Sequence, residues 1–147
     1  SPSLENVTVT NNTTSGDGGG IYSDESSPII NNSTISMNTA ETGGGISVST
    51  ESSVYIDNCE ISGNSSGGPG GGLAIQSESN ATLNNVLFAN NECSHDGGAI
   101  SAKESSDLSI NNTSIINNIA DNSGGGLYAI YNTSWPSGAK GPPRDPP

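Results

Sequence analysis

Apolar residues stand two positions apart in short segments of the chain and are sparse elsewhere. In the middle of the sequence Ile46 and Val48, and then Val54 and Ile56, alternate with serine and tyrosine. A period of two is typical of β-strands with one buried face. A helix is disfavoured, because Gly, Asn, Ser and β-branched residues fill these segments. The pattern predicts about three short strands, separated by turns, in each stretch of 25 to 27 residues.

Three markers recur in phase along the chain. The first is a pair of glycines shortly before an aliphatic residue: Gly18 and Gly19, Gly43 and Gly44, Gly70 and Gly71, Gly97 and Gly98, Gly124 and Gly125. The second is an Asn three positions after an apolar residue: Asn12, Asn38, Asn64, Asn91 and Asn118. The third is an Asn two positions after an aliphatic residue: Asn6, Asn32, Asn58, Asn85 and Asn112. The aliphatic residues after the glycine pairs are 25, 27, 27 and 27 positions apart, which indicates five copies of one repeat.

Repeats of this length predict an all-β fold, a parallel β-helix in which each repeat forms one of about five coils. Stacked coils bring equivalent residues to the spacing of paired strands, about 4.8 Å. The aliphatic residues then line a narrow core, and the Asn residues of the third marker are expected to form a stacked amide ladder. The glycine pairs are expected to need positive φ or close backbone approach. Ala99, at the position after one pair, indicates that a Cβ is tolerated there.

Residues 1–134 are predicted to form the β-helix, and residues 135–147 a proline-rich extended tail. Five of the eight prolines lie in that tail, and proline cannot donate to a β-ladder. The first repeat begins near Leu4 without a capping helix, so we expect a fragment of a longer rod. Neighbouring β-helix coils or a membrane anchor outside this chain would continue it.

Composition and charge narrow the class of protein. The hydrophobic fraction is only 29%, which favours disorder, but a disordered chain would not keep its apolar residues in phase with its glycines. The net charge of −12 disfavours nucleic acid and anionic membranes as partners. Because no run approaches about 18 apolar residues, no transmembrane segment is predicted. Any export signal is expected to have been removed or to lie upstream.

Residues 88–91 (Phe-Ala-Asn-Asn), followed by residues 97–100 (Gly-Gly-Ala-Ile), resemble a known motif pair. These are the Phe-x-x-Asn and Gly-Gly-Ala-Ile motifs of the chlamydial polymorphic outer-membrane protein repeats. The fourth repeat carries both in full, whereas the others have Val or Ile for Phe and Gly for Ala. The resemblance covers roughly residues 4–131. It implies a right-handed helix, in agreement with the usual crossover preference, and a passenger displayed by an autotransporter barrel for adhesion.

We therefore expect a non-catalytic, adhesin-like β-helical stalk that presents loops to a host-cell surface protein or a glycan. The loops are the segments between each second-marker Asn and the next glycine pair, such as Ser65 to Pro69 and Glu92 to Asp96. The implied location is extracellular or at the cell surface, which is the outer membrane in a Gram-negative organism.

A carbohydrate-active enzyme is the alternative function, because β-helices also include pectin lyases and glycoside hydrolases. Its catalytic coil would lie outside this chain or use a column of glutamates spaced 26, 27 and 26 positions apart: Glu25, Glu51, Glu78 and Glu104. A lyase is disfavoured, because Lys103 is the one basic residue in the repeats. The glutamates are consistent with a solvated turn, a weak Ca²⁺ site or a catalytic pair. Their uniform repetition favours the solvated turn, so no cofactor is predicted, with calcium as the alternative.

His95 and Asp96 are adjacent and could act as an acid–base pair, but the sequence places no nucleophile beside them. A solvated loop histidine is therefore expected. Cys59 is expected to pack inward, whereas Cys93 falls in a loop one repeat later. A disulfide between the two cysteines is disfavoured, because they belong to different columns.

Asn-x-Ser/Thr sites and aromatic side chains are two further features that could connect the chain with carbohydrate. Ten Asn-x-Ser/Thr sites occur, and those in the expected amide ladder, such as Asn32 and Asn112, are predicted to be inaccessible. Phe88 is expected to point inward. Tyr22 and Tyr128 share an outward column but are separated by Ser and Ala, so no continuous platform for sugars is predicted.

Overall fold

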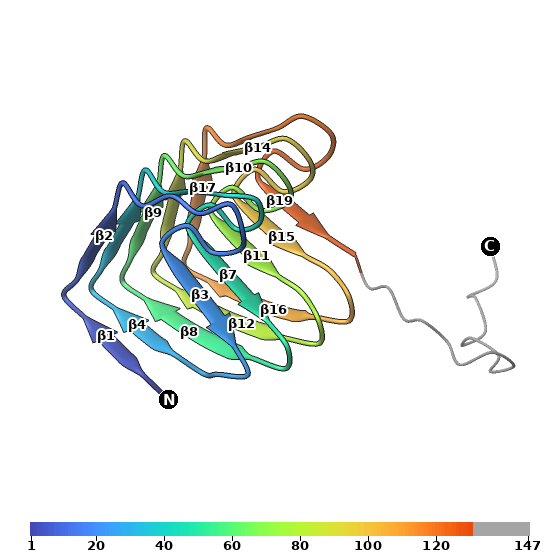
Figure 1. Cartoon of the computed structure of the whole chain (residues 1–147). Coiled ribbons are helices and arrows are strands. Elements are labelled where there is room, and N and C mark those ends of the chain that lie inside the picture. The colour runs from blue at the N-terminus through green and yellow to red at the C-terminus, as the bar shows by residue number, and fades with distance from the viewer. Residues whose placement is uncertain (131–147) are drawn as a thin grey trace, which may run out of the picture.

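The computed structural model describes residues 1–130, which wind into a stack of coils that contains strands and turns (Figure 1). Equivalent strands of successive coils pair side by side and parallel. The predicted all-β parallel β-helix of about five coils is confirmed. The boundary predicted at residue 134 and the proline-rich tail lie outside the described residues.

The strands form four sheets, which we number in the order in which a coil passes through them. Sheet 1 contains β1 (Ser3–Glu5), β4 (Ile29–Asn31), β8 (Ser53–Asp57), β12 (Asn80–Asn84) and β16 (Asp107–Asn111). Sheet 2 contains β2 (Thr8–Thr10), β5 (Thr34–Ser36), β9 (Glu60–Ser62), β13 (Leu87–Ala89) and β17 (Ser114–Ile116). Sheet 3 contains β6 (Thr39–Ala40), β10 (Ser65–Ser66), β14 (Glu92–Cys93) and β18 (Ile119–Ala120). Sheet 4 contains β3 (Ile21–Asp24), β7 (Ile46–Ser49), β11 (Leu73–Ile75), β15 (Ile100–Ala102) and β19 (Leu127–Ala129).

Four strands build each coil from the second to the fifth, whereas the sequence predicted about three. The additional strands are those of sheet 3, in which β10 pairs with β6 on one side and β14 on the other. In the first coil only an isolated bridge joins Thr13 to Thr39. These strands are two residues long, too short to show alternation in the sequence. The segments 65–69 and 92–96, expected to be loops, are therefore partly sheet.

Aliphatic columns fill the interior, as the repeat spacing predicts. In sheet 1 Ile56 pairs with Leu83, and in sheet 2 Ile61 pairs with Phe88; all four side chains are fully buried. Burial of one such side chain contributes about 1.5–3 kcal/mol. Since each coil repeats the arrangement on three sheets, a chain of low hydrophobic content can still build a continuous core.

A second layer of turns covers the outer face of sheet 4. Ser47, Ala74 and Ser101 occupy the outward column predicted for them, yet they are only 0, 2 and 1% exposed. The preceding turns lie against them, because a Cβ added to Gly70 would come within 2.8 Å of the Ala74 Cβ. The turns thus fold back over the sheet, so outward residues become buried.

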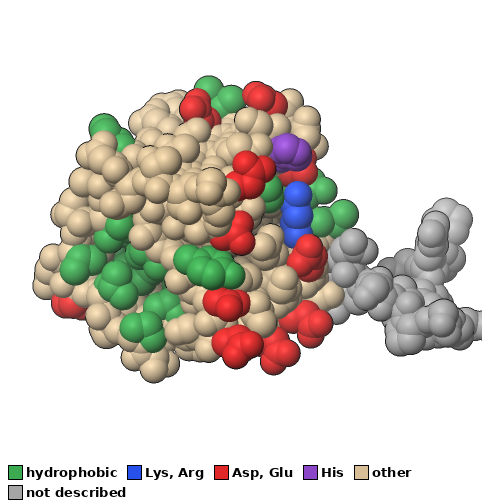
Figure 2. Space-filling view, in the orientation of Figure 1, with side chains coloured by type: hydrophobic (Ala, Val, Ile, Leu, Met, Phe, Trp, Pro, Cys, Tyr) green, Lys and Arg blue, Asp and Glu red, His purple; other side chains and the backbone are tan. Residues whose placement is uncertain are grey.

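The visible face of the molecule is largely polar, with acidic side chains distributed around one Lys (Figure 2). Apolar side chains also reach this surface in several places. Within residues 1–130, no helix has the length and hydropathy that a bilayer span requires.

Candidate functional site

The Asn residues of the second marker form a ladder that runs through the coils, and its three inner members are buried. Asn38, Asn64 and Asn91 are 0% exposed. The Oδ1 atom of Asn64 accepts from the backbone N–H of Asn38 at 3.0 Å and from its Nδ2 at 3.1 Å. Asn64 Nδ2 donates to Asn91 Oδ1 and to the Ile35 carbonyl, each at 3.0 Å. Every coil is therefore joined to the next by side-chain hydrogen bonds in addition to the β-ladders.

The Asn residues of the third marker adopt the left-handed conformation, with φ between 44° and 55°. The amide ladder expected here is present at two steps, from Asn58 to Asn32 and from Asn112 to Asn85. At another step a carboxylate intervenes, because Asn85 Nδ2 donates to Asp57 Oδ1 at 2.8 Å. The column lies on the surface and lines an open groove of about 620 Å³. The prediction that Asn32 and Asn112 are inaccessible to glycosylation is wrong, since both are exposed.

The glycine pairs occupy the turn that folds over sheet 4. The first glycine of each pair has φ between 62° and 76°. In the first four pairs the second glycine leaves no room for a Cβ beside carbonyl oxygens of the next coil, whereas a Cβ on Gly125 would lie 2.9 Å from the Asn118 carbonyl oxygen of its own coil. The third position was expected to tolerate a Cβ. At Gly45 and Gly72, however, a Cβ would lie 2.5 and 2.7 Å from a carbonyl oxygen. Ala99 fits its own coil, but the tolerance does not extend to these two glycines.

The glutamate column lies at the turn that enters sheet 1. Glu25, Glu51, Glu78 and Glu104 are all exposed and have φ between 45° and 58°. Glu104 Oε2 accepts from the N–H and the hydroxyl of Ser77, each at 3.1 Å. Glu25 and Glu51 line a common hollow of about 320 Å³. Among residues 1–130, no three His, Cys, Asp or Glu side chains gather so that they could hold a metal ion, and weak calcium binding stays a prediction.

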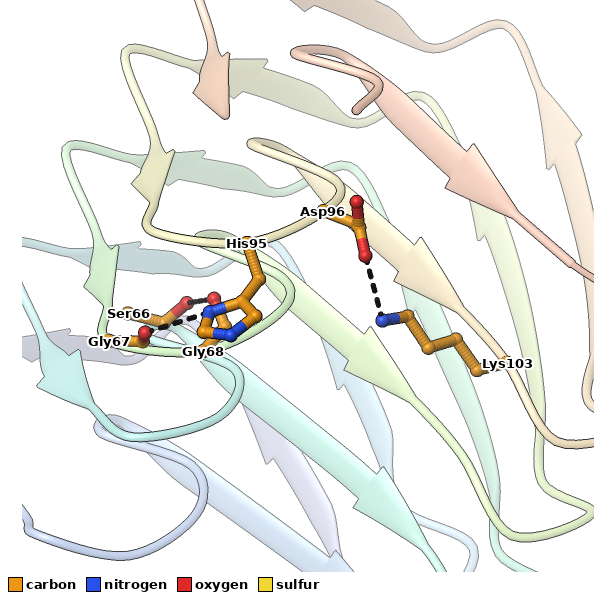
Figure 3. Close-up of polar contacts among 6 residues, drawn as sticks. All are labelled: Ser66, Gly67, Gly68, His95, Asp96 and Lys103. Atoms are coloured by element: carbon orange, nitrogen blue, oxygen red, sulfur yellow. Dashed lines mark hydrogen bonds and ion pairs between the residues drawn. The ribbon is translucent and has the colours of Figure 1, made fainter. Parts of the chain in front are cut away.

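His95 and Asp96 point to different partners (Figure 3). His95 Nδ1 lies 3.1 Å from the Gly67 carbonyl oxygen. Asp96 Oδ2 accepts from Lys103 Nζ at 3.1 Å, and the same ammonium group lies 5.0 Å from the centre of the Tyr128 ring. The two residues are therefore not joined as an acid–base pair: His95 contacts a turn of the preceding coil, whereas Asp96 pairs with a residue of its own coil.

Both cysteines are buried and carry free thiols. Cys59 packs in the core, as expected. Cys93 lies in β14 rather than in a loop. Burial raises the pKa of the Cys59 thiol and the pKa of the Cys93 thiol above their usual value. Both are thus protonated and weakly nucleophilic at neutral pH.

A family model described as right handed beta helix region matches residues 3–138. The chain belongs to the right-handed β-helix family. No curated protein and no solved structure matches the chain. The handedness implied by the resemblance to the chlamydial repeats agrees with this family, whereas membership of that narrower repeat family stays a prediction.

In this β-helix the sequence located the buried Asn column but assigned the amide ladder to the exposed one. The two columns differ in backbone conformation. Each second-marker Asn follows a residue with positive φ, namely Asn11, Met37, Gly63, Asn90 and Asn117, whereas each third-marker Asn has a positive φ itself. Residue type does not reveal this difference, because an Asn also precedes the exposed Asn32, Asn85 and Asn112.

Proposed function

We propose that this β-helix is a non-catalytic stalk that presents side chains to a partner at a cell surface, in the manner of an adhesin passenger. The proposal rests on the surface formed by sheet 3 and the turns that follow it. We name this surface the presenting ridge; it consists of residues 39–42, 65–69, 92–96 and 119–123.

The backbone of the presenting ridge is held in place from coil to coil. The N–H of Gly67 donates to the Ala40 carbonyl at 3.0 Å, and the N–H of Ser94 donates to the Ser66 carbonyl at 3.1 Å. The hydrogen bond from Asn122 N–H to the His95 carbonyl, at 3.0 Å, continues the series. These hydrogen bonds fix the backbone that carries the side chains of the presenting ridge.

The side chains of the presenting ridge differ between coils, and this variation is the observation that carries the proposal. In one outward column Thr39, Ser65, Glu92 and Ile119 stand in register. Hydroxyl, carboxylate and aliphatic groups thus follow one another, and Ile119 is 61% exposed. Since such residues can change without disturbing the aliphatic columns, the ridge suits recognition of a partner protein or glycan.

A glycoside hydrolase is the second candidate, and the hollow shared by Glu25 and Glu51 is the observation that favours it. The general acid of such an enzyme needs surroundings that raise its pKa, which burial provides. Glu25 and Glu51 are exposed, so neither has the buried surroundings of such an acid. A lyase is less consistent with the site, because Lys103 is already paired with Asp96.

The test is binding of the labelled full chain to an array of acidic and neutral glycans and to cultured epithelial cells. We expect binding that survives Glu51→Gln and Glu78→Gln and is lost when Glu92 and His95 are both replaced by alanine. Ser109→Ala, on the outer face of sheet 1, is the matched control and should bind normally. Turnover of an array glycan that Glu51→Gln abolishes would overturn the proposal, as would binding that is indifferent to the ridge substitutions.

A further inference from the structure

The Asn-x-Ser/Thr sites of the sequence differ in whether the folded chain leaves them open. Such a site accepts an Asn-linked glycan where it lies at the surface of an exported protein. At one site, Asn64 and the hydroxyl residue Ser66 are 0 and 2% exposed. At four others the residue two positions after the Asn is at least partly exposed and the Asn itself is exposed, namely Asn6, Asn32, Asn80 and Asn112. The fold therefore closes the first site and leaves the other four open to a bulky substituent.

The hydrogen bonds of the side-chain amides separate the two kinds of site further. Asn64 Nδ2 donates both of its protons, one to Asn91 Oδ1 and one to the Ile35 carbonyl, each at 3.0 Å. Asn32 Nδ2, in contrast, donates one proton to Glu5 Oε1 at 2.5 Å. A glycosylated Asn keeps one N–H on Nδ2, so a sugar on Asn32 is compatible with this hydrogen bond. A sugar on Asn64 would break the buried ladder.

The hydroxyl of each site distinguishes between overlapping candidates. Asn111 and Asn112 both begin an Asn-x-Ser/Thr site, and their hydroxyl residues are Thr113 and Ser114. Thr113 Oγ1 donates to the Asn111 carbonyl at 2.9 Å, whereas Ser114 is exposed. Because the transferring enzyme recognises the hydroxyl, Asn112 is favoured over Asn111. The overlapping sites at residues 31–32 repeat this arrangement.

The four open sites lie away from the presenting ridge. Asn6, Asn32 and Asn112 stand at the corner between sheets 1 and 2, and Asn80 lies on the outer face of sheet 1. In Figure 1 the ridge strands β10 and β14 are at the top, whereas β1 and β4 are at the bottom. No Asn of the ridge begins an Asn-x-Ser/Thr site. Asn6 and Asn32 are one coil apart, about 4.8 Å, which is too close for two sugar chains, so one of them is expected to carry a glycan.

We propose that Asn80, Asn112 and one of Asn6 and Asn32 are acceptors for Asn-linked glycans. The sugar donor is a lipid-linked oligosaccharide pyrophosphate. In the transfer, Nδ2 forms a bond with C1 of the first sugar and loses one proton, while the bond between C1 and the pyrophosphate oxygen breaks and its electron pair leaves with the pyrophosphate. The bulky, solubilising glycans coat sheet 1 and its corner with sheet 2, and they leave the presenting ridge bare.

Expression of the full 147-residue chain in a eukaryotic secretory host tests the proposal site by site. The secreted monomer is treated, in heavy-oxygen water, with an amidase that releases Asn-linked glycans and converts each occupied Asn to labelled Asp. Peptide mass spectrometry then locates the label, and a sample without the amidase measures spontaneous deamidation. We expect label at Asn80, at Asn112 and at one of Asn6 and Asn32, with none at Asn64. Absence of label from any of the three positions, or label at Asn64 in the folded monomer, would overturn the proposal.

Substitutions at the hydroxyl residues assign the label without altering the amides. Ser114→Ala should abolish the label at Asn112, whereas Ser114→Thr keeps the hydroxyl and should retain it. Ser109→Ala is the matched control, because Ser109 is an exposed serine of the same coil that belongs to no Asn-x-Ser/Thr site. Circular dichroism checks that the variants fold. A Ser114→Ala chain that stays labelled at Asn112 would overturn the assignment.

Translation in the presence of microsomes gives a second readout that does not require secretion. Each transferred glycan should slow the electrophoretic mobility of the chain, and the amidase should reverse the shift. A chain without any such shift would overturn the proposal. Cell binding by the presenting ridge is measured separately and should be unchanged in Ser114→Ala, so a failure of the glycan assignment is distinguishable from a failure of the proposed function.

Discussion

Among single Asn substitutions in the third coil, we expect Asn64→Ala to destabilise the fold most. The substitution removes the Oδ1 atom that accepts from the backbone N–H and Nδ2 of Asn38. Among residues 1–130 the Asn38 N–H has no second acceptor, and Nδ2 retains only the Val9 carbonyl. Two buried donor protons thus lose their partner, at about 1–3 kcal/mol each. We expect the free energy of unfolding to fall by about 3–5 kcal/mol, a large part of the about 5–15 kcal/mol typical of a domain.

The matched control is Asn58→Ala, six positions earlier on the same coil. Asn58 is exposed and donates to Asn32 at the surface, so water can replace the lost hydrogen bond. Its left-handed backbone is less favourable for alanine, at about 1 kcal/mol. Asn58→Gly should remove that strain, whereas Asn64→Gly should not restore the buried ladder.

Guanidinium unfolding, followed by circular dichroism, gives the free energy of unfolding of both variants. The dependence of this free energy on guanidinium concentration is compared between them, because a changed slope indicates a loss of two-state behaviour. Amide hydrogen exchange adds the local readout, since protection at Asn38 should decrease in Asn64→Ala before protection in the fifth coil does. Equal losses of stability in the two alanine variants, or an Asn38 amide that stays as protected as before, would refute the assignment of the buried ladder.

Four further outcomes are expected. Gly71→Ala should lower the free energy of unfolding by about 3 kcal/mol, because its Cβ would overlap carbonyl oxygens of the next coil. A Cβ on Gly16 would be in ordinary contact with the Thr14 hydroxyl, at 3.8 Å, so Gly16→Ala should be neutral in the same denaturation assay. Ser101→Ala should raise it by about 1 kcal/mol, since the Ser101 hydroxyl is buried without a hydrogen-bond partner; a decrease would contradict this. A chelator should leave the melting temperature unchanged if the glutamate turns are solvated, and a lower melting temperature would support the calcium alternative. Because burial raises the folded pKa values of the Cys59 and Cys93 thiols above their usual value, their contribution to stability should be complete below about pH 8.5 and be lost as the pH rises through the folded pKa values; replacement of both by alanine should abolish this loss in melts at pH 8 and above.

The fold could be predicted because the repeat is defined by residue types that recur at a fixed spacing along the sequence. Glycine pairs, aliphatic residues and Asn residues that stay in phase permit one arrangement, a stack of coils, and Phe88 and the aliphatic columns lie where the period places them. The strands of sheet 3 could not be found in the same way, because two residues carry no period. The family match adds the handedness.

For the candidate site, the sequence predicted the column to which each residue belongs better than it predicted how buried that residue is. The sequence placed Asn64 and Asn58 in separate columns, but it could not decide which column is buried, since both are Asn with a similar neighbourhood. It likewise placed Glu25 and Glu51 one coil apart without showing that they share a hollow. Burial depends on which turns fold over which face, and that is a property of the packed coils.

By itself, the sequence determined the period, the parallel stacking and the identity of each column, because a fixed spacing forces equivalent residues into hydrogen-bonding register. Only the tertiary structure decided which columns are shielded from solvent. The turns fold back over sheet 4 and bury Ser47 and Ser101, while the corner between sheets 1 and 2 leaves Asn32 and Asn58 in water. The physical reason is that solvent access is set by neighbours from other coils, whereas the direction of a side chain is set by its own strand.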